Sequence, residues 1–159
     1  NFEWTGVSLD INEDFVRTYS EQRKNICLLK DATTVNYEAL FNALDLPTEI
    51  DYLQIDCDPP ENSFKALLNI PFETRKFGVI TFEHDHYANK ETSIRDKSRK
   101  YLESYGYKLV VNNIAPDDWR AYEDWWIHPD LIDEKIVSKF LLINDDAKKA
   151  RDYMLGLLK

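Results

Sequence analysis

The strongest constraint on the fold is a regular alternation between short apolar runs and segments with helical spacing. The apolar runs lie at 4–10, 26–30, 50–56, 77–83 and 107–112. Between them, apolar side chains recur three and four residues apart, as at Tyr37, Leu40, Phe41 and Leu44, which marks one face of a helix. Strands that alternate with helices build parallel sheets with right-handed crossovers. The sequence therefore predicts an α/β fold of three layers, Rossmann-like, with a mostly parallel sheet and helices on both faces.

Local signals place the ends of the predicted helices. Asn12 is a good N-cap for a helix after the first strand, and Pro47 stops the helix that begins near Tyr37. Pro59 and Pro60 suit the start of a third helix, and Gly106 suits the position just after a fourth. The chain shows no repeat, linker or low-complexity tract, so we expect residues 1–159 to form a single domain.

Charge and cysteine content limit the classes of function. The formal net charge of −9 argues against a phosphate-binding face, so we expect no nucleic-acid partner. No apolar run approaches the ~18 residues that cross a bilayer, which predicts no membrane partner. Cys27 and Cys57 lie outside any CxxC pattern, which favours free thiols in a reducing, cytoplasmic compartment over a disulfide. A small-molecule acceptor is the expected partner, and a homo-oligomer stays open.

Polar, mostly acidic residues follow four consecutive predicted strands. In open parallel sheets, ligands bind just beyond the carboxyl ends of the strands. The residues at these ends are Asp10, Asn12, Asp31, Asp56, Asp58, Glu83, His84, Asp85 and His86. An Asp after a strand usually caps a helix or closes a turn. Four such ends in succession nevertheless favour a ligand site along one edge of the sheet.

Two of these ends suit a nucleoside. An acidic residue at a strand end commonly accepts hydrogen bonds from ribose hydroxyls, and Asp10 is the candidate here. Asp31 is placed to accept a hydrogen bond from an adenine amino group, and the small Ala32 next to it leaves room for the ring. Asp10, Asn12, Asp31 and Ala32 are therefore the candidate cofactor-binding residues.

The order of five segments resembles FkbM-like S-adenosylmethionine-dependent methyltransferases, over roughly residues 2–113. The segments are WTGVSLDIN, NICLLKDA, IDYLQIDCDPPENSFKAL, FGVITFEHDHY and YGYKLVVNN. The resemblance implies that Asp10 holds the ribose, that Asp31 and Ala32 lie at the adenine, and that Glu83 lies near the transferred methyl group. It implies S-adenosylmethionine as cofactor and O-methylation of a sugar or another small-metabolite hydroxyl.

The sequence departs from that family in two places. The Gly-rich loop that follows the family's first strand is absent, since the four glycines include no Gly-x-Gly. The segment CDPPEN stands where the family usually has a glycine followed by an acidic residue. We expect the chain to begin at the family's second strand, so that the first, central strand either precedes Asn1 or is replaced by a rearranged sheet.

Transfer to a hydroxyl needs a group that removes its proton, and a carboxylate or imidazole can do so. The candidates are Asp56, Asp58, Glu83, His84 and His86, with Asp56 and His84 expected first. The alternative for the two histidines is a set of hydrogen bonds within a loop.

Two other functions compete. Asp56-Cys57-Asp58 is an Asp-x-Asp, the arrangement by which many sugar-nucleotide glycosyltransferases hold a divalent metal. Oxygen ligands suit Mg or Mn, and His84 or His86 could complete an Mn site. The missing glycine loop favours a third interpretation, a non-catalytic relative that acts as a binding module.

An aromatic segment follows the last predicted strand. Trp119, Tyr122, Trp125 and Trp126 lie among acidic residues. We expect a helix or loop whose rings anchor the core or a lid, and the alternative is a lid that stacks on a sugar or an aromatic acceptor.

Overall fold

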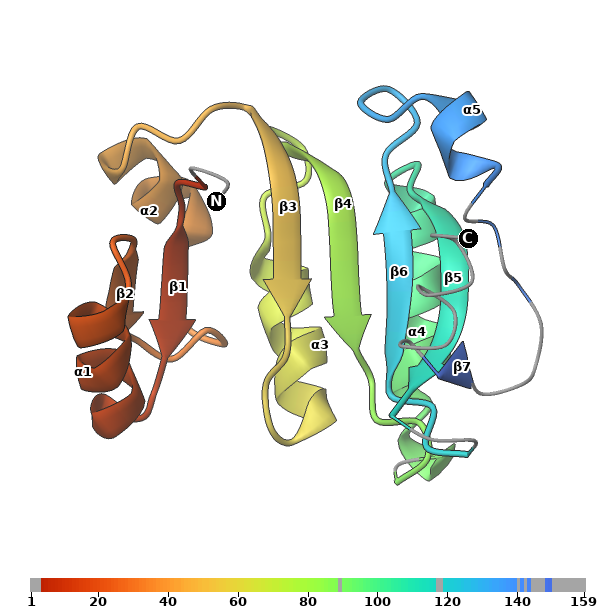
Figure 1. The fold of residues 1–159 in the computed structure, drawn as a ribbon, viewed down its shortest axis with the longest axis horizontal. Coiled ribbons are helices and arrows are strands. Elements are labelled where there is room, and N and C mark those ends of the chain that lie inside the picture. Colours follow the sequence, from red (N-terminus) through yellow and green to blue (C-terminus); the bar gives the residue numbers. More distant parts are fainter. Residues whose placement is uncertain are drawn as a thin grey trace.

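The computed structural model describes residues 4–88, 90–116, 119–139, 141, 143, 148 and 149. All five predicted strand regions are strands, and the alternation with helices is confirmed (Figure 1). The strands are β1 (Val7–Asp10), β2 (Ile26–Leu29), β3 (Glu49–Ile55), β4 (Lys76–Glu83), β5 (Lys108–Ala115), β6 (Glu123–Ile127) and β7 (Lys148–Lys149). The helices are α1 (Glu13–Gln22), α2 (Tyr37–Ala43), α3 (Pro60–Asn69), α4 (Ile94–Ser104) and α5 (Glu134–Val137), with a 3₁₀ turn η1 (Lys90–Thr92).

The helix ends follow the local signals. The side chain of Asn12 accepts hydrogen bonds from the backbone N–H groups of Asp14 and Phe15, at 2.9 and 3.2 Å, and so caps α1. Pro60 occupies the first turn of α3, where its missing N–H costs nothing. Gly106 has a φ of 86°, a left-handed conformation that glycine adopts easily after a helix.

The strands form two separate hydrogen-bonded sheets. One holds β1 and β2, paired in parallel, and the other has the order β3-β4-β6-β5-β7. β3 and β4 are parallel, but β6 runs antiparallel to both β4 and β5. The mostly parallel sheet that the sequence predicts is therefore a mixed sheet in its second half.

The aromatic segment corrects one prediction in part, because from Glu123 onward it forms strand β6 in the middle of the larger sheet. Trp119 and Tyr122 precede that strand in a loop. Trp126 is completely buried in the main core, while its neighbour Trp125 packs with a second cluster around Val111 and Ile114. Successive side chains of a strand point to opposite faces, so the adjacent residues Trp125 and Trp126 pack on opposite faces of the sheet.

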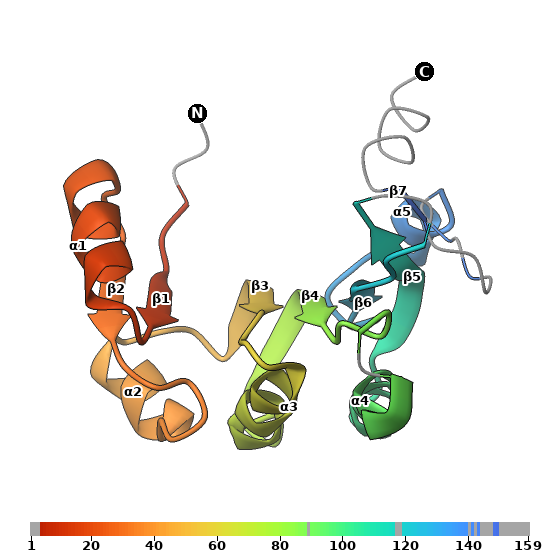
Figure 2. The ribbon, with the colours of Figure 1, turned by 90° about the horizontal axis from the view of Figure 1, so that it is seen from below.

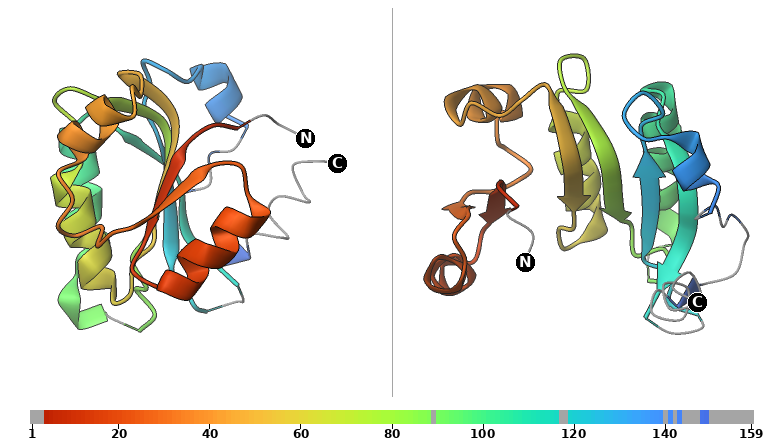
Figure 3. Two further views of the ribbon diagram at one scale, coloured as in Figure 1. Left: turned by 90° about the vertical axis from the view of Figure 1, so that its left-hand side faces the viewer. Right: turned by 45° about the horizontal axis from the view of Figure 1, so that its top comes forward.

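Within the described part of the chain, β1 pairs only with β2, and β3 pairs only with β4 on their respective sheets. In the described residues, the edges of β1 and β3 that face each other therefore form no backbone hydrogen bonds with a neighbouring strand. The two sheets are separated in each view (Figures 1 and 3). Side chains connect them, because Leu9 and Ala32 pack against the cluster that holds Phe41 and Phe77. Among the described residues, no strand pairs with either of these facing edges.

The two faces of the larger sheet differ. α2, α3 and α4 lie on one side and α5 on the other, while α1 packs against β1 and β2 of the smaller sheet (Figure 2). The opposite face over β3 and β4 stays open, where Tyr52 is 41% and Trp4 is 59% exposed. A hollow of about 450 Å³ lies there, at the amino ends of β3 and β4, lined by Trp4, Glu49, Ile50, Asp51, Gly78, Val79, Leu131 and Ile132.

Candidate functional site

The carboxyl ends of β1, β2 and β3 converge around Cys57. Asp10 ends β1, Asp31 follows β2, and Asp56 follows β3. Burial raises the pKa of the Cys57 thiol, and the negative charges of Asp56, Asp31 and Asp10 raise it further. Each of the three carboxylates is therefore near enough to Cys57 for its charge to act on the thiol.

Of the residues predicted to bind the nucleoside, Asn12 has a structural role and Asp10 lies at a strand end. The side chain of Asn12 is occupied in capping α1. Asp10 accepts a hydrogen bond from the Asn12 backbone N–H at 2.7 Å through Oδ1, which fixes its carboxylate at the strand end. This bond holds Asp10 in place for an incoming donor.

Asp31 is held in a similar way. Its Oδ1 accepts hydrogen bonds from the N–H and the hydroxyl of Thr33, at 2.8 and 2.7 Å, and these bonds lower the pKa of Asp31. The Ala32 carbonyl accepts a bond from the Tyr37 hydroxyl at 2.9 Å. Asp31 is therefore an ionised acceptor on a turn that the core anchors.

A second group of carboxyls gathers at the ends of β3, β4 and β6. Burial, the charges of Asp56 and Asp85, and a hydrogen bond to Asp56 raise the pKa of Glu83 to about 8. Burial also raises the pKa of Asp85, with the charge of Asp58 adding to it. Burial raises the pKa of Glu123. Perturbed acids of this kind mark candidate proton-transfer sites.

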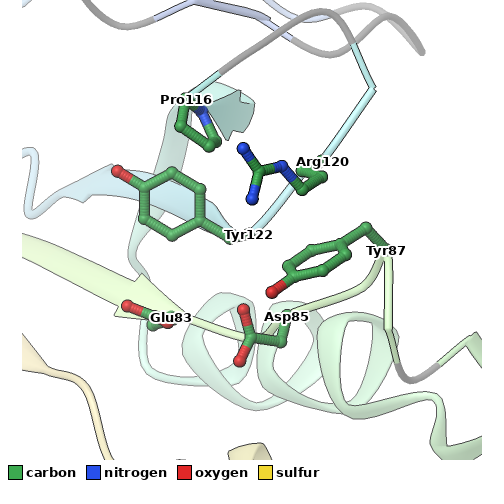
Figure 4. A pocket seen from close by; sticks show the side chains of 6 residues that line it. All are labelled: Glu83, Asp85, Tyr87, Pro116, Arg120 and Tyr122. Carbon is green, nitrogen blue, oxygen red and sulfur yellow. The ribbon is translucent and has the colours of Figure 1, made fainter.

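A pocket of about 180 Å³ opens onto this group (Figure 4). It is lined by Glu83, Asp85, Tyr87, Pro116, Arg120 and Tyr122. The Arg120 guanidinium lies on the side of the pocket that faces the carboxyl groups of Glu83 and Asp85 (Figure 4). The pocket thus offers acidic groups, a cation and aromatic walls.

Trp119 stands beside this pocket and is 67% exposed. Its ring meets that of Tyr87 edge-on, with centroids 6.0 Å apart, and the Arg120 guanidinium lies 5.7 Å from the Trp119 centroid. Of the aromatic segment, Tyr122 lines the pocket and Trp119 is the most exposed ring.

His84 corrects a second prediction. It is completely buried and lies across β4 from Glu83, since side chains alternate along a strand. Its Nδ1 accepts a hydrogen bond from the His86 backbone N–H at 3.2 Å, and its Nε2 lies 3.3 Å from Asp124 Oδ1. His84 does not line the pocket, so it is not placed to take a proton from an acceptor there.

The remaining predicted residues have mixed placements. His86 is half-buried, and burial followed by the charge of Arg95 lowers its pKa, but it does not line the described pocket. The backbone carbonyl of Asp58 accepts a bond from the Asn62 side chain at 3.1 Å. Among the residues that the structure describes, no three His, Cys, Asp or Glu side chains are grouped to hold a metal ion, so the Mg or Mn prediction gains no support.

Sequence reasoning missed Tyr87, Arg120, Tyr122 and Glu123 as site residues. The signal that could have found the last two is the alternation in β6 and the residues before it, which return antiparallel to β4. The backbone carbonyl of Tyr122 accepts bonds from the N–H groups of His84 and Asp85, at 2.7 and 3.1 Å. This pairing brings the start of β6 beside the end of β4.

No protein-family model matches the sequence, and no curated protein matches it. Among solved structures, the chain is similar to the crystal structure of the S. pombe Dnmt2 methyltransferase, with a TM-score of 0.56 and 16% sequence identity. The chain has a methyltransferase-like fold. The match covers 88% of this chain and 48% of that one, so the chain spans about half the length of the structure it matches. Within the described residues, no helix is long and apolar enough to cross a membrane.

Proposed function

We propose that this chain forms part of an S-adenosylmethionine-dependent O-methyltransferase, FkbM-like, that acts on a hydroxyl of a sugar or another small metabolite. The observation that carries the proposal is the position of Asp10, Asp31 and Asp56 at the carboxyl ends of β1, β2 and β3, where the charge of each acts on Cys57, in a fold similar to that of a methyltransferase. Free Cys27 and Cys57 support the cytoplasmic location that we propose with it.

The residues at the ends of β1 and β2 fit the nucleoside half of the cofactor. Asp10 presents a fixed carboxylate for the ribose hydroxyls, and ionised Asp31 presents an acceptor for the adenine amino group. Ala32 adds no bulk at this point. When bound, S-adenosylmethionine supplies a methyl group already activated by its sulfonium.

The acceptor would bind in the pocket beside Glu83. Because Asp56 is a hydrogen-bond partner of Glu83 and the pKa of Glu83 is about 8, the Glu83 carboxylate is suited to take the proton of an acceptor hydroxyl once it is ionised, above about pH 8. Asp56 and Glu83 replace His84 as the first candidates for this role. Trp119 and Tyr87 supply ring faces against which a sugar or planar acceptor packs.

We also propose that one further parallel strand lies between β1 and β3. Both strands present an unpaired edge toward the same gap, and both point in the same direction (Figure 1). Unpaired strand edges favour pairing with another strand. The Gly-rich loop that the resemblance implies for the methionine part of the cofactor would follow that strand.

Calorimetric titration with S-adenosylhomocysteine tests the proposal. We expect Asp10→Asn to bind at least about tenfold more weakly than the native chain, because a hydrogen bond to a charged acceptor contributes about 1.5–3 kcal/mol. Asp14→Asn is the matched control, since Asp14 pairs with Arg17 on the surface of α1. The titration is run on this chain and on a form that includes any natural sequence before Asn1.

Binding by the extended form alone supports the added strand together with the cofactor. Binding by neither form refutes the methyltransferase proposal, as does equal binding by Asp10→Asn and Asp14→Asn. If neither form binds S-adenosylhomocysteine, a uridine or guanosine diphosphate sugar is the next ligand to test. If no such sugar nucleotide binds either, the remaining interpretation is a non-catalytic binding module.

A further inference from the structure

A buried carboxylate, Asp124, connects three strands and a helix directly behind the pocket. Its side chain is almost completely buried. Arg99 of α4 donates two hydrogen bonds to it, from Nε to Oδ2 at 2.7 Å and from Nη2 to Oδ1 at 3.0 Å. The backbone N–H of Asn113 in β5 donates to Oδ1 at 2.9 Å. His84, just beyond β4, brings its Nε2 to 3.3 Å from the same oxygen.

Asp124 keeps its negative charge in this environment. Burial by itself raises the pKa of a carboxyl, but the contacts with His84 and Arg99 and their charges outweigh burial and hold the pKa of Asp124 well below its ordinary value. Buried ion pairs seldom stabilise a fold more than apolar residues of the same volume. The network therefore calls for a role other than stability.

The ring of His84 has a defined orientation. Its Nδ1 accepts the His86 N–H, so Nε2 is the ring nitrogen that carries a proton, and it faces Asp124. The Nε2–Oδ1 contact is electrostatic and does not have the direction of a good hydrogen bond. With both nitrogens engaged, the ring fixes the chain immediately after Glu83.

Two residues beside the network have strained backbones. Asp85 has a φ of 43° and Asn113 a φ of 57°, left-handed conformations that residues other than glycine adopt at a cost. The Asn113 side chain accepts bonds from Arg95 and Arg99, at 3.3 and 3.1 Å. Such conformations persist where surrounding contacts hold them, and here the contacts belong to the same network.

Alternation along the strands relates the network to the pocket. His84 and Asp124 point into the core, so Glu83 and Glu123, which precede them and pair across β4 and β6, point to the other face. Asp85, beyond β4, lines the pocket together with Glu83. We propose that Asp124 is a positioning residue that, by holding His84, Arg99 and Asn113, fixes the ends of β4, β5 and β6 so that these three acids meet. The importance of this arrangement for catalysis rests on the proposed function, but the arrangement itself does not.

The carboxyl titration of Glu83, followed by carbon-13 NMR, tests the proposal without any cofactor. The charged groups that face Glu83 are Asp56 after β3, Asp85 after β4 and Glu123 from β6, with Arg120 across the pocket (Figure 4). In Asp124→Asn these groups separate, and we expect the Glu83 midpoint to fall by about one pH unit or more. Asp130→Asn, which removes a surface ion pair with Lys76, is the control and leaves the midpoint unchanged.

Two conservative variants decide the case if Asp124→Asn does not fold. His84→Gln keeps a donor toward Asp124 and an acceptor toward the His86 N–H, so the Glu83 midpoint stays close to the native one. Arg99→Lys keeps the charge but loses the two-point contact, so the midpoint falls. A native midpoint in folded Asp124→Asn or in Arg99→Lys overturns the proposal.

The result of the Glu83 titration can be distinguished from the result of the cofactor-binding experiment. If the native protein binds no S-adenosylhomocysteine but the midpoints shift as expected, the methyltransferase proposal fails and the positioning role stands. If the cofactor binds and the midpoints do not move, Asp124 is a structural anchor only.

Discussion

Replacement of Glu83 by glutamine should change how the stability of the protein depends on pH. The folded protein keeps a proton on Glu83 up to a pKa of about 8, whereas the ordinary value is 4.5. Between these values the unfolded state binds fewer protons than the folded state, so the free energy of unfolding falls as the pH rises. In Glu83→Gln the side chain does not titrate, and this part of the pH dependence disappears.

The magnitude follows from the two pKa values. At about 1.4 kcal/mol per pH unit, their difference sets an upper limit of about 5 kcal/mol. Glu83 is only half-buried, so solvent screening reduces the effect, and we expect about 2 kcal/mol between pH 5 and pH 8. Because burial also raises the pKa of Asp85 and of Glu123, the variant keeps a residual slope of the same sign.

Urea unfolding followed by tryptophan fluorescence, at pH 5, 6, 7 and 8, measures the difference between native protein and variant. Glu73→Gln is the matched control. The Tyr105 hydroxyl donates to Glu73 at 2.6 Å and lowers its pKa, so this glutamate is ionised throughout the range and its removal leaves the slope unchanged. A Glu83→Gln variant that loses stability as steeply as the native protein would refute the reasoning.

Two further substitutions test the packing that supports the site. At Gly78 a Cβ atom would come within 2.9 Å of the Asp51 carbonyl oxygen, so Gly78→Ala should lower the free energy of unfolding by about 1–3 kcal/mol, measured in urea. Gly6→Ala, with nothing within 4 Å of its Cβ, is the control, and equal stability of the two variants contradicts the prediction. Asn36 caps α2 by accepting the Ala39 N–H at 3.0 Å, so Asn36→Ala should cost about 1 kcal/mol, and an unchanged midpoint of thermal unfolding by circular dichroism would count against it.

The sequence was sufficient for the elements whose signals are local. Asn12, Pro60 and Gly106 act at helix ends through their own backbone or side chain, and the structure has all three in those roles. The strand ends that carry Asp10, Asp31 and Asp56 follow from the rule for parallel sheets, so half of the candidate site could be placed without coordinates.

Strand β6 was missed because its pattern depends on distant partners. Asp124 sits in the core only because Arg99, 25 residues earlier in the chain, satisfies it. Read alone, two successive acidic residues between aromatic ones, Glu123 and Asp124 here, indicate a surface position. The residues around Asp124 in the sequence do not indicate that its carboxylate is buried beside Arg99 of helix α4.

The error at His84 has a different origin. Whether His84 or Glu83 faces the pocket depends on the register of the last residues of β4, and a shift of one residue reverses every side chain. Register is set here by pairing with β6, which the sequence did not reveal. Arg120 and Tyr87 likewise enter the site through that pairing, since the Tyr87 N–H donates to the Ala121 carbonyl at 3.2 Å.

The division into two sheets has a consequence for how the protein responds to temperature. Among the described residues, side chains such as Leu9 and Ala32, and not ladder hydrogen bonds, couple β1 and β2 to the larger sheet. Apolar contacts weaken on cooling, whereas each ladder stays intact. Cooling would therefore loosen the contact between the two sheets before either sheet unfolds. Asp10, on the smaller sheet, would then lose its fixed position relative to Glu83, on the larger one, while nearly all of the secondary structure remains.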